Sequence, residues 1–122
     1  MTHSRNKGSH AERELCDKLN SMGMMCRRTV QYCGKGGDAD ITCLELGLHV
    51  EVKRVEAFKW DETMAQVQRD SRGKPWIIAH RKSRMPWVII QTLDAWAADS
   101  HAAHRAIAAR RKLMEEAADA NS

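Results

Sequence analysis

The sequence predicts one α/β or α+β domain in which helices flank a mixed β-sheet, followed by a C-terminal helix. Its 122 residues are enough for one compact domain. Short runs rich in β-branched residues alternate with segments whose apolar residues recur at helical spacing, and glycine or proline separates most of them. Together these observations predict the element order α-β-β-β-α-β-β-α.

The first predicted helix begins near His10. Ser9 and Glu12 have the spacing of a capping box, in which two side chains bond the free backbone N–H groups of the first turn. Gly23 is a natural end for this helix, because glycine readily adopts the left-handed backbone of a helix terminus. Apolar residues recur at helical spacing in between: Leu15, Leu19 and Met22.

Three strands are expected after this helix, at residues 24–30, 39–46 and 48–55. The stretch "QYCGKGGDAD" between the first two contains three glycines and is predicted to be a loop. Gly47 separates the last two strands, which therefore form a hairpin.

A second helix is predicted over residues 59–71, because Trp60, Met64 and Val67 recur at helical spacing. The apolar runs "WIIAH" and "WVIIQ" follow as strands, separated by the basic turn "RKSRMP". Both strands belong to the same domain.

The end of the chain is predicted to be helical. Residues 93–98 suggest one or two helical turns, and the alanine-rich tract over 100–118 has high helix propensity. We therefore divide the chain into a domain over residues 1–98 and a C-terminal helix over 99–122, which packs on the domain or on a second subunit.

Charge is distributed unevenly along the chain, whose net charge is +4. Residues 1–37 carry seven basic and three acidic side chains, residues 38–62 carry three and seven, and residues 63–96 carry six and two. An acidic centre between two basic segments suits a site that binds divalent cations and whose rim binds phosphates. A polyanionic partner is compatible with this pattern.

The four cysteines, at positions 16, 26, 33 and 43, do not have the Cys-x-x-Cys spacing of a zinc site. Each lies in or beside an apolar run, so we expect buried free thiols in a reducing cytoplasm. No apolar run approaches the roughly 18–20 residues of a membrane span. We therefore expect a cytoplasmic protein that does not enter a membrane.

The predicted strand at residues 48–55 places an acid and a base on the same face. Side chains alternate along a strand, so the valines face the core while Glu51 and Lys53 face a cleft or water. If residues 39–46 pair with this strand, Asp40 lies near Glu51. Two neighbouring carboxylates repel each other, and Mg²⁺, which prefers oxygen ligands, relieves that repulsion. A lysine beside such an ion can orient the attacking water or stabilise charge on a phosphate.

The pattern Asp40…Glu51-x-Lys53 on adjacent strands resembles that of the PD-(D/E)xK nucleases. The segment "NKGSHAERELCDKLNSMGM" is similar to the opening of the archaeal-type Holliday junction resolvases, which has a basic-Gly-Ser turn and a helix bearing Glu-Arg-Glu. The segment "WIIAHRKSRMPWVII" resembles the last strands of short phage-encoded members of the superfamily. The resemblance covers about residues 6–92 and leaves the C-terminal helix outside.

This resemblance implies a restriction-endonuclease-like core and a Mg²⁺-dependent DNA endonuclease, with Mn²⁺ as a substitute and no small-molecule cofactor. The family's first helix supplies an acid to the metal site, and Glu12 is the matching position. The acids would bind the metal, the lysine would position the attacking water, and a glutamine would contact the scissile phosphate or water, with Gln68 a weaker match for that role. The implied catalytic residues are Glu12, Asp40, Glu51, Lys53 and Gln66.

The resemblance also implies a substrate and an assembly. The expected substrate is a four-way (Holliday) junction in DNA recombination or repair. A junction presents two equivalent strands, so a twofold homodimer with two active sites is expected. If the protein is phage-encoded, it would act in the host cytoplasm.

Two assignments in this set stay open. An alanine occupies the proline position of the Pro-Asp pair, which leaves Asp38 as an alternative to Asp40. We prefer Asp40, because Ile41 follows it directly as the first core residue of the strand. Glu12 has a competing role as the capping-box partner of Ser9.

Basic residues of the amino-terminal turn, the glycine loop and the hairpin tip are the candidate contacts to DNA phosphates. Such contacts position a nucleic acid without reading its sequence, which fits recognition of DNA shape. The candidates are Lys7, Ser9, Arg27, Arg28, Lys35, Arg81, Lys82 and Arg84.

The tryptophans could stack on bases or pack in a core or interface. Tryptophan stacks well on bases, but all four lie at apolar-periodic positions, which favours packing in a core or interface: Trp60, Trp76, Trp87 and Trp96. His80 is likewise expected to make ordinary hydrogen bonds in the sheet rather than act as a general base.

Other functions are compatible with the sequence. One alternative is a nuclease of the same fold that is specialised for repair, restriction-like cleavage or phage cleavage of host DNA. A non-catalytic DNA-binding module would keep the charged residues for structure alone, and a small toxin- or antitoxin-like protein would bind another protein. The complete set of three acids and a lysine favours an enzyme over the last two.

Overall fold

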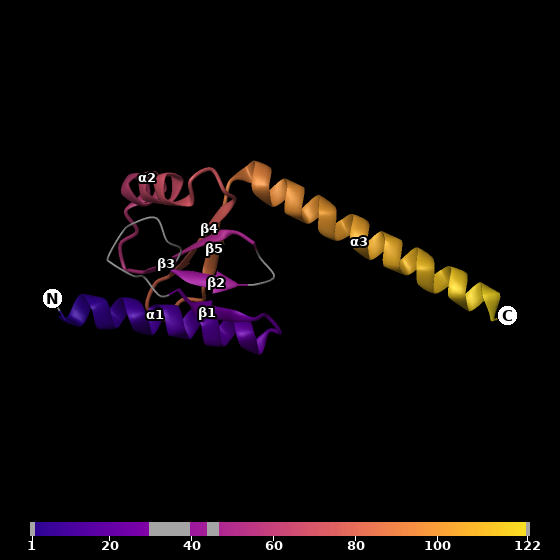
Figure 1. Cartoon of the computed structure of the whole chain (residues 1–122), viewed down its shortest axis with the longest axis horizontal. Helices are drawn as coiled ribbons and strands as arrows, with labels where there is room; N and C mark the ends of the chain where they lie inside the picture. The colour runs from indigo at the N-terminus through magenta and orange to yellow at the C-terminus, as the bar shows by residue number, and fades with distance from the viewer. Residues whose placement is uncertain (1, 30–39, 44–46, 122) are drawn as a thin grey trace. The chain divides into compact units, whose positions relative to one another are not determined.

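The computed structural model describes residues 2–29, 40–43 and 47–121, with side chains described from residue 8 onward. These residues form three helices and five strands, in the predicted order (Figure 1). The elements are α1 (Thr2–Ser21), β1 (Cys26–Arg28), β2 (Ile41–Cys43), β3 (His49–Arg54), α2 (Trp60–Ser71), β4 (Trp76–Arg81), β5 (Val88–Ile90) and α3 (Leu93–Ala120).

The described strands form one mixed sheet in the order β1-β2-β3-β4-β5. The first three strands pair antiparallel, β3 and β4 pair parallel, and β5 is antiparallel to β4. The parallel pair is joined through α2, because parallel neighbours need a crossover connection. The predicted pairing of the second and third strands is confirmed, with Ile41 opposite Val50. The predicted glycine loop and the turn at residues 44–46 lie outside the described residues.

Helices cover both faces of the sheet. Val50 of β3 is fully buried in a cluster that includes Leu15 of α1, so α1 covers the face of the valines. Ile78 of β4 is the register partner of Glu51 and is fully buried on the opposite face, where α2 contacts β4 and supplies the fully buried Val67. Figure 1 shows α1 and α2 on opposite sides of the strands. The sheet is therefore the middle layer of three.

α1 begins at Thr2, upstream of the predicted start. Ser9 lies inside the helix, so the predicted capping box is wrong: a capping serine must precede the helical backbone. The predicted end is confirmed. Gly23 has φ 95°, and the N–H of Met24 donates to the Leu19 carbonyl oxygen at 3.1 Å, a bond typical of this kind of helix terminus.

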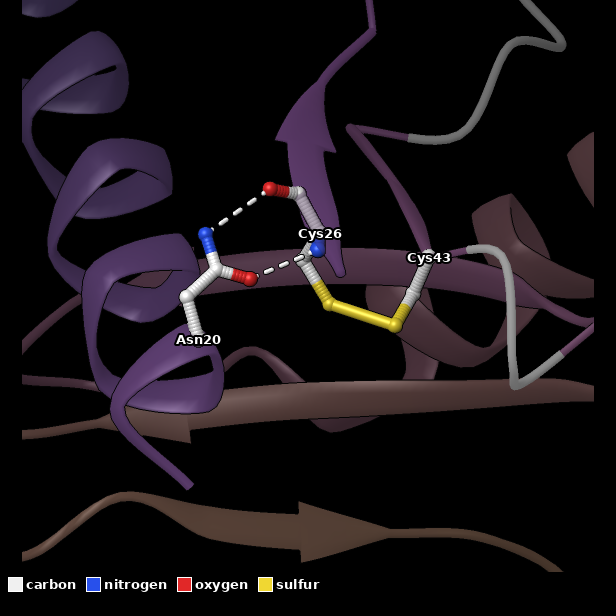
Figure 2. Close-up of a disulfide and its surroundings, with 3 residues drawn as sticks. All are labelled: Asn20, Cys26 and Cys43. Carbon is white, nitrogen blue, oxygen red and sulfur yellow. Dashed lines mark hydrogen bonds between the residues drawn. A yellow bond between two sulfur atoms is a disulfide. The ribbon is translucent and has the colours of Figure 1, made fainter. Parts of the chain in front are cut away.

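Two of the cysteines are paired, so the prediction of free thiols is wrong for them. Cys26 and Cys43 are register partners on β1 and β2 and form a disulfide (Figure 2). The Asn20 side chain of α1 bonds both backbone groups of Cys26, at 2.6 Å to its N–H and 3.0 Å to its carbonyl. Cys16 is free and buried, as predicted, and Cys33 lies outside the described residues. The helix end and the sheet edge are thus joined at one point.

The tryptophans were predicted to pack in a core or an interface; they do not all pack in the core, and an interface stays a prediction for the exposed ones. Trp87 packs against the cluster covered by α1, whereas Trp60 and Trp96 are more than half exposed. His80 meets its prediction: its ring nitrogen bonds the Val55 carbonyl oxygen at 3.1 Å.

The C-terminal region is one continuous helix where the sequence predicted two helical pieces. Thr92 begins it, because its hydroxyl oxygen accepts the N–H of Ala95 at 3.1 Å. The chain divides into two compact units, residues 1–90 and 91–122, and α3 belongs to the second. Its packing on the domain or on a second subunit stays a prediction. None of the helices in the described ranges is long and apolar enough to cross a membrane.

Candidate active site

Two carboxyl groups meet where β2 pairs with β3. Asp40 directly precedes β2, and its N–H donates to the Val50 carbonyl at 3.0 Å. Its carboxylate accepts the N–H of Val52 at 2.7 Å, which turns the side chain toward β3. There it lies within hydrogen-bonding reach of the Glu51 side chain. The structure therefore brings together the two acids that the sequence predicted to be neighbours.

Glu51 does not face water, because α2 covers it. Its residue exposure is 3%, and polar side chains contact both carboxylate oxygens. A His49 ring nitrogen lies 3.1 Å from Oε1, and the Gln66 amide nitrogen lies 3.4 Å from Oε2. The amide oxygen of Gln66 accepts a hydrogen bond from the Lys53 ammonium at 3.0 Å. One glutamine of α2 thus links the acid and the base of the Glu-x-Lys strand.

The environment of this pair opposes ionisation of both acids. Burial, followed by the negative charge of Glu51, raises the pKa of Asp40 to about 7, against the lowering effects of the Val52 N–H and of Lys53. Burial also raises the pKa of Glu51. A proton on Asp40 relieves the repulsion between the two groups, and a bound cation would do the same.

The donor set fits a divalent cation of the Mg²⁺ type. Mg²⁺ typically uses one or two carboxylates, and water or substrate completes its shell. Asp40 and Glu51 provide two such groups, and a bound cation would offset the repulsion that, after burial, raises the pKa of Asp40. Within the described ranges, no three His, Cys, Asp or Glu side chains are grouped to hold an ion by themselves. Among the described residues, the acids that lie together here are Asp40 and Glu51.

Glu12 lies beside this pair but is bonded to an arginine. Its carboxylate accepts a hydrogen bond from Nε of Arg28 at 2.9 Å, and Nη2 of the same arginine donates one to the Ser9 hydroxyl oxygen at 3.0 Å. Glu12 and Lys53 both line an open pocket of about 280 Å³ between α1 and the end of β3. After burial and the negative charge of Asp70, the charge of Glu12 also contributes to the raised pKa of Glu51. A role for Glu12 at the metal stays a prediction.

We expect Arg28→Ala and Arg28→Lys each to lower the free energy of unfolding by about 1 kcal/mol. One guanidinium donates hydrogen bonds to both Ser9 and Glu12, and the ammonium of a lysine cannot reproduce this planar pair of donors. Urea denaturation measures the effect, with the exposed neighbour Arg27→Ala as the matched control. Equal stability of all three variants and the wild type would contradict this role.

The predicted phosphate contacts are in different situations. Arg81 donates hydrogen bonds to Glu14 and to the Met85 carbonyl oxygen. Arg28 likewise donates a hydrogen bond to Ser9. These three candidates therefore have partners within the protein. Three of the basic candidates are exposed, one on β1 and two in the β4–β5 turn: Arg27, Lys82 and Arg84. The side chain of Lys7 and the whole of Lys35 lie outside the described residues, as does Asp38.

The sequence interpretation missed His49. It lies two positions before Glu51, so strand alternation alone would have placed it on the same face. Its side chain is 5% exposed. Burial lowers the pKa of this imidazole.

Comparisons with known proteins establish the fold. No family model matches the sequence, and no curated protein matches it either. The structure is similar to that of Hjc, a Holliday junction resolvase from the archaeal hyperthermophile Archaeoglobus fulgidus. The TM-score is 0.53 and the sequence identity 19%, over 68% of this chain and 75% of that chain. The predicted restriction-endonuclease-like core, a mixed sheet flanked by helices with a further C-terminal helix, is therefore confirmed as the fold of this protein.

Proposed function

We propose that this protein is a Mg²⁺-dependent endonuclease that hydrolyses phosphodiester bonds in branched DNA, four-way junctions above all. The observation that carries the proposal is the buried pair of Asp40 and Glu51 on adjacent strands, with Lys53 joined to it through Gln66. A fold of this kind can host several activities, so these side chains, and not the fold, support this activity.

The two carboxylates would hold the ion. When bound, Mg²⁺ would activate a water molecule and neutralise charge on the phosphate. Mn²⁺, which also takes oxygen ligands, would substitute for it. Glu12 is the third acid proposed for this centre, since it lines the same pocket as Lys53.

Lys53 would orient the attacking water or stabilise negative charge on the phosphate in the transition state. Lys53 is half-buried, and the Gln66 amide oxygen accepts a hydrogen bond from its ammonium at 3.0 Å, which restricts where the ammonium can point. Gln66 in turn contacts Glu51, so the base keeps a fixed relation to the metal-binding acid. We expect Gln66 to contribute by this positioning and by contact with the phosphate.

Exposed basic residues would bind the DNA backbone on either side of the site. Arg27 extends from β1, and Lys82 and Arg84 from the β4–β5 turn. Lys7 and Lys35 are proposed for the same role. The similarly folded archaeal protein is a Holliday junction resolvase, which supports a junction as the first substrate to test. Symmetric cleavage of a junction would require a homodimer.

The test is a comparison of three labelled DNA substrates of matched sequence: a four-way junction, a linear duplex and a single strand. Each is incubated with the purified protein in Mg²⁺, in Mn²⁺ and in EDTA. We expect paired, symmetric nicks in the junction that require a divalent metal. A mutant with Glu51→Gln serves as the control for contaminating nucleases.

The other outcomes separate the alternatives. Equal metal-dependent cutting of all three substrates would keep the nuclease and reject the junction specificity. Binding to DNA without cleavage in either metal would contradict an enzyme and favour a DNA-binding module.

A further inference from the structure

We infer that His49 is a positioning residue for the metal-binding carboxylate: its ring N–H holds Glu51 in the orientation that faces Asp40. This inference rests on the proposed function. The Asp…Glu-x-Lys pattern does not include this histidine. Its proposed role follows from contacts in the structure alone.

The backbone fixes where the imidazole lies. His49 is the first residue of β3, and its N–H donates to the Pro75 carbonyl at 2.9 Å, at the start of the parallel ladder with β4. Strand alternation then places its side chain on the same face as Glu51. The side chains of this histidine and of Glu51 are only 5% and 4% exposed. Water therefore has little access to compete for their contact.

The chemistry of the contact determines which group donates. An ionised carboxylate only accepts hydrogen bonds, so the His49 ring nitrogen 3.1 Å from Oε1 must carry a hydrogen. This fixes the Nε2–H tautomer of a neutral ring, since the contacting nitrogen is Nε2.

The second oxygen of Glu51 is restrained from the other side. The Gln66 amide nitrogen lies 3.4 Å from Oε2, a longer contact than that of His49. The contact from His49 is therefore shorter than that from Gln66, and His49 is the more buried of the two residues. Partners of this kind that hold a ligand side chain typically change metal affinity or activity about 10–100-fold when removed.

A pair of unbranched substitutions separates donation from packing. Glutamine and methionine have similar length, but only glutamine can donate a hydrogen bond to Glu51. His80→Met is the matched control, because His80 lies on β4 and bonds the Val55 carbonyl instead of an acid. Binding of Mn²⁺ alone, followed by the loss of the free-ion electron paramagnetic resonance signal, reports the site without DNA or turnover.

We expect His49→Met to weaken Mn²⁺ binding about 10–100-fold, while His49→Gln and His80→Met stay within about threefold of the wild type. Equal Mn²⁺ affinity of a folded His49→Met variant and the wild type would overturn the inference. Failure of the folded wild type itself to bind Mn²⁺ would instead count against the proposed function.

A measurement on the wild-type protein covers the case in which His49→Met does not fold. Long-range ¹H–¹⁵N spectra of the imidazoles distinguish the two neutral tautomers. We expect the hydrogen of His49 on Nε2, both before and after addition of Mg²⁺. A hydrogen on Nδ1 with Nε2 bare would contradict donation to Glu51.

Discussion

Replacing Lys53 by methionine is expected to lower the rate of DNA cleavage about 10²–10³-fold, the usual cost of removing one group that stabilises transition-state charge. Methionine keeps the length of the side chain and removes the ammonium that Gln66 holds at 3.0 Å. Because the lysine acts in the chemical step, the rate under saturating enzyme should fall while the affinity for DNA changes little. Single-turnover cleavage and a binding titration in Ca²⁺ measure the two quantities.

The matched control is Lys18→Met, since Lys18 is an exposed residue of α1 and has no place in the proposed site. This variant should cleave at the wild-type rate. A Lys53→Met variant that cleaves as fast as the control would remove the lysine from the mechanism. Loss of DNA binding without loss of the saturated rate would make it a substrate contact instead.

Replacing Asp40 by asparagine is expected to stabilise the metal-free protein at pH 8. The folded state binds a proton at Asp40 with a pKa of about 7, against an ordinary value of 3.8. The unfolded chain therefore loses this proton more readily, so the free energy of unfolding falls as pH rises from about 4 to 7. Each pKa unit corresponds to about 1.4 kcal/mol. Asparagine can still accept the Val52 N–H but carries no charge beside Glu51.

Thermal melting in EDTA at pH 5 and pH 8 measures this effect. We expect Asp40→Asn to melt at least about 5 °C above the wild type at pH 8, and the difference to shrink at pH 5. Mg²⁺ should raise the melting temperature of the wild type and have little effect on the variant. Asp17→Asn, at an exposed position of α1, is the control. A variant that melts below the wild type at pH 8 would show that the two carboxylates do not oppose each other.

The strand that carries the site could be predicted because its pattern is local. Alternation along β3 separates the buried Val50 from Glu51 and Lys53, whatever else the chain does. The neighbouring position of Asp40 followed from one further assumption, that the second and third strands pair as a hairpin. Both positions are confirmed, but Glu51 is only 3% exposed and does not face a cleft or water as predicted.

The burial of Glu51 could not be predicted in the same way, because it depends on α2. That helix follows β3 in the sequence but returns over it, and it places Gln66 against Glu51 and Lys53. Gln66 was expected near the site only from the family resemblance. Strand alternation places His49 on the same face as Glu51 but does not give the 3.1 Å contact between their side chains.

The contacts of Ser9 are long-range in sequence, although its spacing to Glu12 predicts a local one. Its spacing to Glu12 is that of a capping box, yet both side chains bond Arg28, which is 19 and 16 positions away in the sequence. Likewise, no spacing rule pairs Cys26 with Cys43, because connectivity follows from the register of β1 and β2. Long-range pairing decides both cases.

The most direct test of the central claim is the single-turnover rate of Mg²⁺-dependent strand cleavage in a four-way junction, measured for the wild type and for Glu51→Gln. Glutamine keeps the shape of the buried side chain and removes the charge that would hold the ion. We expect cleavage by the wild type that is lost in EDTA and is about 10²–10³-fold slower in the folded variant. Cleavage by both proteins at the same rate, or by neither, would contradict the central claim.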